Sequence, residues 1–273
     1  LNTDSQKLEF FAQDRWYEMA TNTPNLDGGT RGLFIGGRTP SNSDVIDYIT
    51  IPTQGNAIDF GNRLEAGRQG GATGSRVRGV ICGRPVPLHS DTIEFLTFAS
   101  TGNTQDFGNA TNTRAGAPMS VSNGTRGIFA GGNSPTFLNN IEFVTIMTTG
   151  NTSDFGDLSF TNTRQANCCS STRGLFSGGY SSLSPAIVNT IEFITIATTG
   201  NSADFGDLTV TNCDHGGASS PTRGVFAGGR PGPSAHNVIN FVEIATTGNA
   251  VDFGNLLANR RQLSGSSNGH GGL

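Results

Sequence analysis

One motif recurs along this chain at a nearly constant spacing, and it restricts the possible folds more than any other feature. The motif is Thr-Arg-Gly, an aliphatic residue, Phe, a variable residue and Gly-Gly. Copies span residues 30–37, 125–132, 172–179 and 222–229, with a degenerate copy at 77–83, and their arginines are 47, 48, 47 and 50 residues apart. A fixed period in this range indicates one repeated supersecondary unit, most often the blade of a propeller.

A representative copy, residues 164–208, predicts four antiparallel strands, which we name a, b, c and d. Strand a covers residues 165–171, strand b 173–179, strand c 190–197 and strand d 203–208. Strand c is rich in β-branched and aromatic residues, and Thr199-Gly200-Asn201 indicates a turn before strand d. Its apolar residues occupy both faces, as in a sheet buried on both sides. Because no stretch has a helical period, the chain is predicted to be all-β.

The copies also predict how the ring closes. Five sets of strands b, c and d begin at Arg31, and residues 261–268 have the pattern of a strand a with no strand b after it. We expect this C-terminal strand to complete the first blade and to close five blades without an exposed sheet edge. Residues 30–273 are then the propeller, and residues 1–29 an N-terminal extension or partial blade. The alternative is six blades with a split sixth, because a hairpin is also discernible around residues 8–18.

The repeat resembles the kelch repeat in its four strands, its double glycine after the second strand and its aromatic strand c. A more specific resemblance is to kelch-like virion structural proteins of marine tailed phages, cyanophages in particular. It lies in the amino-acid sequence of residues 189–201, followed by Asp204-Phe205-Gly206-Asp207-Leu208. The similarity covers about residues 30–273, and it departs from cellular kelch domains because Phe stands in strand d where they have Trp. The resemblance implies a decoration protein or a tail- or fibre-associated protein of the extracellular particle, with other virion proteins as partners. It brings no catalytic residues and no cofactor.

Composition excludes several other classes. Only 14% of the residues are charged and the formal net charge is -4, with no basic run of the kind expected for nucleic-acid binding. No apolar run approaches the roughly 20 residues that span a membrane, so we expect no membrane insertion. The start has no pattern of a secretory signal, and Leu1 in place of Met indicates processing, a fragment or a sequence begun part-way along. The 18 phenylalanines, at repeated positions, argue against disorder.

The residues that could carry chemistry are themselves repeated, which argues against an active site, because a substrate meets an active site once. We expect the strand b arginines to pair with the strand c carboxylates across each blade. The aspartates of five Asp-Phe-Gly triplets are expected to accept backbone N–H groups in turns. The histidines fall in loops without metal-ligand spacing, and we expect them to be exposed. The cysteines are expected to be small buried residues. No enzyme activity, cofactor or metal is predicted.

The connections between strands b and c differ in every copy, whereas the c–d turn is Thr-Gly-Asn in four of five copies. We therefore predict that the b–c connections recognise a partner, with a host-surface glycan or receptor as an addition, and that the other face is scaffold or docking surface. Free drift of exposed loops explains the variation equally well. A lectin-like propeller outside any virion is the alternative function. The candidate recognition residues are Arg38, Asn42, His89, Phe137, Tyr180, Arg230 and His236, and the candidate docking residues are Phe10, Phe11, Trp16 and Tyr17.

Overall fold

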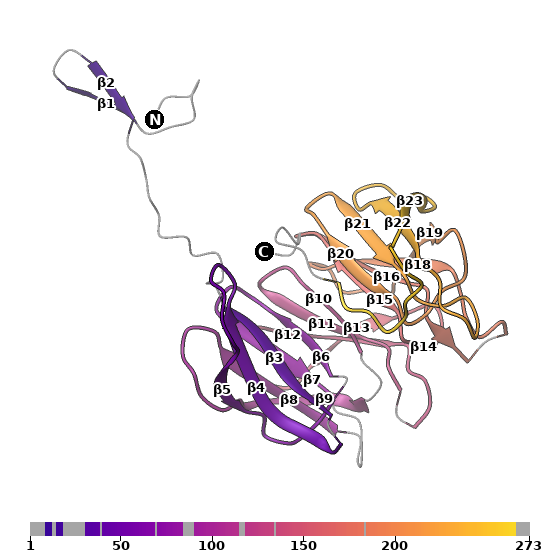
Figure 1. The fold of residues 1–273 in the computed structure, drawn as a ribbon, viewed down its shortest axis with the longest axis horizontal. Coiled ribbons are helices and arrows are strands. Elements are labelled where there is room, and N and C mark those ends of the chain that lie inside the picture. Colours follow the sequence, from indigo (N-terminus) through magenta and orange to yellow (C-terminus); the bar gives the residue numbers. More distant parts are fainter. Residues whose placement is uncertain are drawn as a thin grey trace.

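The structure is a computed structural model that describes residues 9–12, 15–18, 31–38, 40–68, 70–83, 90–114, 118–133, 135–182 and 184–265, the first two ranges as backbone alone. The described residues contain no helix, and five small antiparallel sheets are arranged as a five-bladed β-propeller (Figure 1). The predicted all-β propeller of five blades is therefore confirmed.

The strands follow the predicted order a, b, c, d in blades two to five, and the first blade has strands b, c and d within the described residues. Blade one comprises β3 (Arg31–Arg38), β4 (Asn42–Thr50) and β5 (Ile58–Asn62). Blade two comprises β6 (Gly71–Gly74), β7 (Arg78–Cys82), β8 (Ser90–Thr97) and β9 (Gln105–Arg114). Blade three comprises β10 (Met119–Ser122), β11 (Arg126–Ala130), β12 (Asn140–Thr145) and β13 (Ser153–Asp157). Blade four comprises β15 (Ala166–Cys169), β16 (Arg173–Ser177), β18 (Thr190–Thr195) and β19 (Ala203–Asp207). Blade five comprises β20 (Gly216–Ser219), β21 (Arg223–Ala227), β22 (Val238–Glu243) and β23 (Val251–Asn255).

Two further pairs of strands lie outside the blades. The hairpin of β1 (Glu9–Ala12) and β2 (Arg15–Glu18) forms a sheet of its own, as the pattern around residues 8–18 predicts. It pairs the backbones of Phe10 with Tyr17 and of Phe11 with Trp16, but these four side chains, the candidate docking residues, lie outside the described part. The second pair is β14 (Asn162–Thr163) with β17 (Tyr180–Ser181).

The C-terminal segment differs from the prediction within its described part. Residues 261–265 form no strand, and the first blade's sheet ends at β3 among the described residues. Instead, the backbone of Gly265 lies against Gly217 in β20, strand a of blade five. Successive a strands pack side by side around the centre, β6 with β10, β10 with β15 and β15 with β20. Residues 263–265 therefore continue this inner row without pairing with β3.

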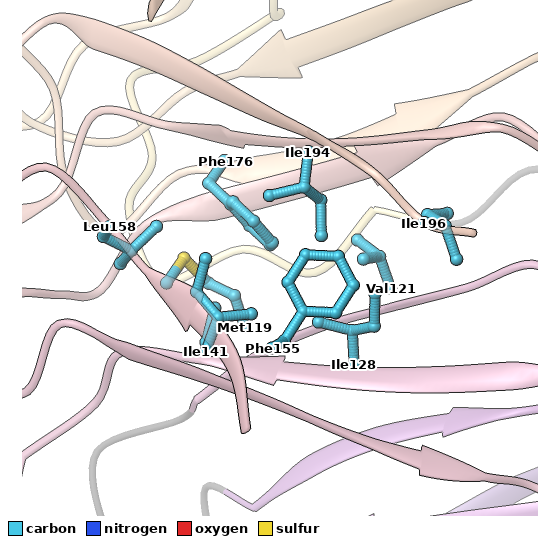
Figure 2. Close-up of a cluster of buried hydrophobic side chains, with 10 residues drawn as sticks. Met119, Val121, Ile128, Ile141, Phe155, Leu158, Phe176, Ile194 and Ile196 are labelled. Carbon is cyan, nitrogen blue, oxygen red and sulfur yellow. The ribbon is translucent and has the colours of Figure 1, made fainter. Parts of the chain in front are cut away.

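Apolar side chains from adjacent blades form one buried cluster at each contact between them. Figure 2 shows the cluster between blades three and four, in which Phe155 and Ile128 of blade three meet Phe176 and Ile194 of blade four. Equivalent clusters join blades one and two, two and three, and four and five. Burying one Phe or Ile side chain stabilises a fold by about 1.5–3 kcal/mol. In blades two to four, neighbouring blades cover both faces of strand c, which explains why its sequence is apolar on both faces.

The Thr-Gly-Asn turns hold neighbouring blades together. In the contact between blades three and four, the Gly200 N–H donates to the Phe155 carbonyl at 2.7 Å, and Asn201 Oδ1 accepts from the Asp157 N–H at 3.0 Å. The Ser202 N–H then donates to the Asp157 carbonyl at 2.9 Å. The same three hydrogen bonds, two between backbones and one to the Asn side chain, join the other adjacent blades. We call this set of bonds, with its apolar cluster, a blade junction.

The glycine of Asp-Phe-Gly is required by this junction. At Gly156 φ is 146°, and a Cβ there would lie 2.4 Å from the carbonyl oxygen of Gly200 in the next blade. A side chain would therefore face both an unfavourable backbone conformation and a backbone clash. The aspartates of these triplets were expected to accept backbone N–H groups, and this was wrong. Their carboxylates are exposed and accept no hydrogen bond within the described residues. The side chain that accepts a backbone N–H here is the Asn of Thr-Gly-Asn, as Asn201 accepts from Asp157 of the preceding blade.

The expected pairing of strand b arginines with strand c carboxylates is wrong in blades one to four because of the strand register, and in blade five Arg223 pairs with Glu243 at 2.8 Å. In blade three, Arg126 lies opposite Thr145, whereas Glu142 lies opposite Phe129. The Arg126 guanidinium stacks 4.6 Å from the Phe143 ring centroid and donates at 2.9 Å to the Ala197 carbonyl of blade four. The arginines of the other blades stack on the equivalent ring in the same way. The arginines of blades one to four therefore support the junction with the next blade, whereas Arg223 of blade five forms a charge pair.

The strand c carboxylates are buried and also cross the junction. Glu94 accepts from the Arg63 guanidinium at 2.8 Å and from the Leu64 N–H at 3.0 Å, both in the preceding blade. Glu142 pairs with Arg114 at 3.2 Å, and both side chains are almost fully buried. These buried carboxylates stabilise the contact between blades and do not form a carboxylate cluster on the surface. The four cysteines are unpaired, and three of them are buried as expected, Cys82, Cys168 and Cys213.

Candidate binding site on the loop face

One face of the propeller carries the connections between strands b and c and those between strand d and the next strand a, because adjacent strands are antiparallel. We call it the loop face, and the opposite face, with the a–b and c–d turns, the turn face. On the loop face a d–a connection pairs with a b–c connection: Thr163 lies opposite Tyr180, and Cys213 opposite Arg230. These short pairings fix the backbone of blades four and five at this face.

Two aromatic side chains from different blades meet there. Phe137 belongs to the b–c connection of blade three and Tyr180 to that of blade four, and their ring centroids are 5.9 Å apart at 86°, edge to face. Such a pair is favourable beyond the area that it buries. The Arg164 guanidinium lies 5.8 Å from the Tyr180 ring centroid. Both rings are partly exposed, so they offer an apolar surface next to a cation.

A carboxylate joins this aromatic pair to the loop of blade five. Asp214 accepts from Arg230 Nε at 2.7 Å and lies 3.8 Å from Arg164 Nη1. The hydrogen bond with Asp214 raises the pKa of Arg230, so Arg230 stays charged. The side chain of Arg164 is 51% exposed and leaves donors free for a ligand. Phe137, Tyr180, Arg164, Asp214 and Arg230 form what we call the loop-face cluster, with two cations and one carboxylate.

The backbone under this cluster has an uncommon conformation. Arg164, Asp214 and Gln262 occupy equivalent d–a connections with φ of 59°, 58° and 59°, the positive-φ residues other than glycine in the described chain. The Asp214 N–H donates to the Arg164 carbonyl at 3.1 Å, and the Gln262 N–H donates to the Asp214 carbonyl at 2.7 Å. Non-glycine residues in this region are uncommon and gather at ligand sites. The positive φ values of these three residues therefore support the loop face as a candidate binding surface.

A buried Ser–His pair lies below the cluster. Ser177 Oγ and His215 Nε2 are 2.9 Å apart, both residues are buried, and the His215 ring lies edge-on to Phe226. Burial lowers the pKa of His215 to about 3, so its ring is neutral at physiological pH. The expectation of exposed histidines is therefore wrong for His215, because it directly precedes β20 and packs against Ser177 and Phe226. Nδ1 of His215 has no partner among the described residues, so no carboxylate orients the ring for catalysis.

Three of the predicted recognition residues are brought together in the loop-face cluster: Phe137, Tyr180 and Arg230. His236 lies in the same loop as Arg230, is partly buried, and accepts from the Val238 N–H at 3.3 Å through Nδ1. Arg38 and Asn42 are opposite each other in the β3–β4 hairpin of blade one, apart from the cluster. Arg38 Nε donates at 2.9 Å to the Pro40 carbonyl of its own loop. His89 lies outside the described residues.

Sequence reasoning missed Arg164 and Asp214, which connect the aromatic pair to Arg230. Arg164 stands in the same Thr-Asn-Thr-Arg pattern as Arg114, yet Arg114 is fully buried against Glu142 whereas Arg164 is exposed. The positive φ of Arg164 distinguishes the two arginines, and no residue pattern encodes it. Asp214 follows Asn212-Cys213 at the corresponding place, and this alignment of the copies was the one signal that could have pointed to it.

The described chain is thus a five-bladed β-propeller with a mixed aromatic and charged cluster on its loop face. No protein-family model matches the chain, and no curated protein matches it. Within the described ranges, no helix is long and apolar enough to cross a membrane. The same ranges hold no group of three or more His, Cys, Asp or Glu side chains placed to bind a metal ion.

Proposed function

We propose that this chain is a non-enzymatic structural protein of a phage particle, with a loop face that binds another protein of that particle. The observation that carries the binding part is the loop-face cluster. It gathers Phe137, Tyr180 and Arg230 from three different loops on the face predicted to recognise a partner. Partly exposed aromatic side chains and arginine are the residue types enriched where proteins bind each other.

The cluster also suggests the chemistry of the partner. Its two guanidiniums outnumber its one carboxylate, and Arg164 is the more exposed of the two. A carboxylate of the partner would bind Arg164, and an apolar side chain beside it would contact the Phe137 and Tyr180 rings. The virion part of the proposal rests on the resemblance of the repeats alone.

The use of the polar groups supports a non-enzymatic role. Glu94 and Glu142 are buried and already bound to arginines of the preceding blade. Ser177 and His215 are buried and cannot meet a substrate from solution. The Thr-Gly-Asn turns and the strand b arginines of blades one to four bind the neighbouring blade, so they serve the fold.

Two experiments test the proposal. Mass spectrometry of purified particles of the phage that encodes the chain should find it at a constant ratio to the capsid or tail proteins, and its absence would refute the virion role. For the loop face, particles assembled without the chain should bind the added wild-type protein. The Tyr180→Ala and Arg164→Ala variants should bind at least about 10-fold more weakly, as expected for interface anchors.

A matched control for these variants is Val77→Ala, at an exposed residue in an a–b turn of the turn face. It should bind like wild type, and equal binding by all variants would contradict a role of the loop face. Host-surface recognition through the same loops is the additional part of the proposal, tested by binding of labelled protein to host cells. A glycan-array signal that depends on Tyr180, without binding to particles, would favour the lectin alternative.

A further inference from the structure

The first and fifth blades each present one half of an unformed blade junction. Blade five ends in Asp-Phe-Gly-Asn-Leu-Leu, the segment that in other blades binds the next blade. Phe253 is 55% exposed, whereas Phe60, Phe107, Phe155 and Phe205 at the same position are 2–3% exposed. A Cβ at Gly254 would meet nothing within 4 Å, whereas one at Gly156 would clash with the next blade. We call this surface, with Leu257, the trailing face.

The complementary half lies on blade one. Ile51 is 66% exposed, whereas Ile146, Ile196 and Ile244 at the same position are almost completely buried by the preceding blade. The Gln54-Gly55-Asn56 turn stands where Thr-Gly-Asn clamps the other blades. Phe34 is exposed as well, although its equivalents Phe129, Phe176 and Phe226 are buried. We call the surface of Phe34, Ile51, Gly55 and Asn56 the leading face.

The polar groups of this fifth junction are also present, and none of them binds another blade within the described residues. Arg173 donates to the Ile244 carbonyl of the next blade at 3.0 Å, but Arg223 binds the exposed Glu243 of its own blade at 2.8 Å. Asp47 is the strand c carboxylate of blade one. Its equivalents accept an N–H of the preceding blade, as Glu192 accepts from Ser159 at 2.9 Å. The corresponding donor is the Leu257 N–H, on a fully exposed residue. The Asp47 backbone pairs with β3 and β5, whereas its carboxylate accepts no hydrogen bond among the described residues.

We propose that the trailing face of one copy binds the leading face of a second copy, head to tail. The new contact repeats the junction that the chain makes four times internally: the Gly55 N–H donates to the Phe253 carbonyl, Asn56 accepts from the Asn255 N–H, and Asp47 accepts from the Leu257 N–H. A second copy is the occupant because it carries the matching half for each face. Within one chain, no hydrogen bond joins the described parts of blades one and five, and Figure 1 draws them at opposite ends of the molecule.

This contact is heterologous, since two different faces meet, and that property supplies a sharp test. Ile51→Asp blocks the leading face and Phe253→Asp blocks the trailing face, and both residues are exposed, so the fold should persist. Each variant alone should lose self-association, with Kd weakened at least about 30-fold relative to wild type. An equimolar mixture should form dimers and nothing larger, because one unblocked leading face and one unblocked trailing face remain. Sedimentation velocity measures all three samples.

The control is Val77→Asp, which places the same charge on an exposed residue outside both faces and should associate like wild type. Two results would overturn the proposal. If wild type and the mixture stay monomeric at every concentration, the faces do not join copies. If each single variant still self-associates like wild type, another surface is responsible. Far-ultraviolet circular dichroism of each variant checks that its β structure is intact.

Discussion

Glu142 and Glu192 occupy the same position in neighbouring blades but have different partners. Glu142 is paired with the buried guanidinium of Arg114 at 3.2 Å. Glu192 accepts from the Ser159 N–H at 2.9 Å and from the Ser202 hydroxyl at 2.7 Å, with no cation beside it in the described chain. In blade five the position is Asn240, which accepts in the same way from the Thr209 N–H at 3.1 Å. An amide is therefore sufficient where no arginine must be neutralised.

This difference predicts unequal effects of the same substitution. Glu142→Gln leaves the Arg114 charge buried without a counter-ion, and we expect it to lower the free energy of unfolding by about 3–5 kcal/mol. Glu192→Gln keeps both hydrogen bonds through its amide oxygen, and we expect a change of less than about 1 kcal/mol. Urea unfolding of the two variants beside wild type measures this. Equal losses would show that the carboxylates are not used differently.

His215 predicts a pH dependence of stability. Burial lowers its pKa to about 3 in the folded protein, below the ordinary value of 6.5. Between these values the unfolded chain binds a proton that the folded chain does not, so stability falls as pH decreases from about 6.5 towards 3, by at most about 1.4 kcal/mol per pH unit. His215→Gln should remove this part of the slope. Unfolding free energies at pH 7 and pH 4.5 test it, and parallel slopes would contradict it.

The glycine of Asp-Phe-Gly in strand d serves both its own backbone conformation and the junction with the next blade. The Gly of Asp-Phe-Gly has nearly the same φ in blades three and five, 146° at Gly156 and 139° at Gly254. At Gly156 a Cβ would lie 2.4 Å from Gly200 of the next blade, and at Gly254 it would meet nothing within 4 Å. The two glycines thus share the backbone requirement and differ in their packing.

This pair isolates the contribution of the junction. Gly156→Ala and Gly254→Ala both carry the backbone strain, about 1–3 kcal/mol, but Gly156→Ala also pushes blades three and four apart. We expect Gly156→Ala to cost at least about 2 kcal/mol more in the free energy of unfolding, within the range of overpacked sites. Thermal and urea unfolding at low protein concentration compare them. The expectation fails if the two variants lose the same stability.

The sequence predicts those features of the strands and turns that follow from residue types recurring in every copy. Strand order, turn positions and the burial of strand c follow from recurring residue types, and they agree with the structure. The partner of each repeated charge does not follow, because pairing depends on register: Arg126 lies opposite Thr145 and not opposite Glu142. Of the loop-face cluster, Phe137, Tyr180 and Arg230 were predicted as separate loop residues. Their meeting requires the spacing of blades and the left-handed backbone of Arg164, neither of which a single residue pattern contains.

At the scale of the whole molecule, the repeated residues are explained by one junction that is formed four times and presented a fifth time on two separate faces. The proposed recognition is assigned to the loop face, since the Thr-Gly-Asn turns of the opposite face bind neighbouring blades. The fifth instance of the junction is proposed to form between two copies of the chain. The trailing and leading faces would form it. The Gly55 N–H is the group whose hydrogen bonding differs most between a free copy and an associated copy.

Amide hydrogen exchange followed by NMR at two protein concentrations tests the head-to-tail contact between copies. The N–H groups of Gly102, Gly150, Gly200 and Gly248 donate to the preceding blade and should exchange slowly at both concentrations. The Gly55 N–H should exchange freely in dilute protein and become protected at concentrations where copies associate. Protection of Gly55 equal to that of Gly150 in dilute monomer would show that the ring closes within one chain, and would contradict the head-to-tail contact.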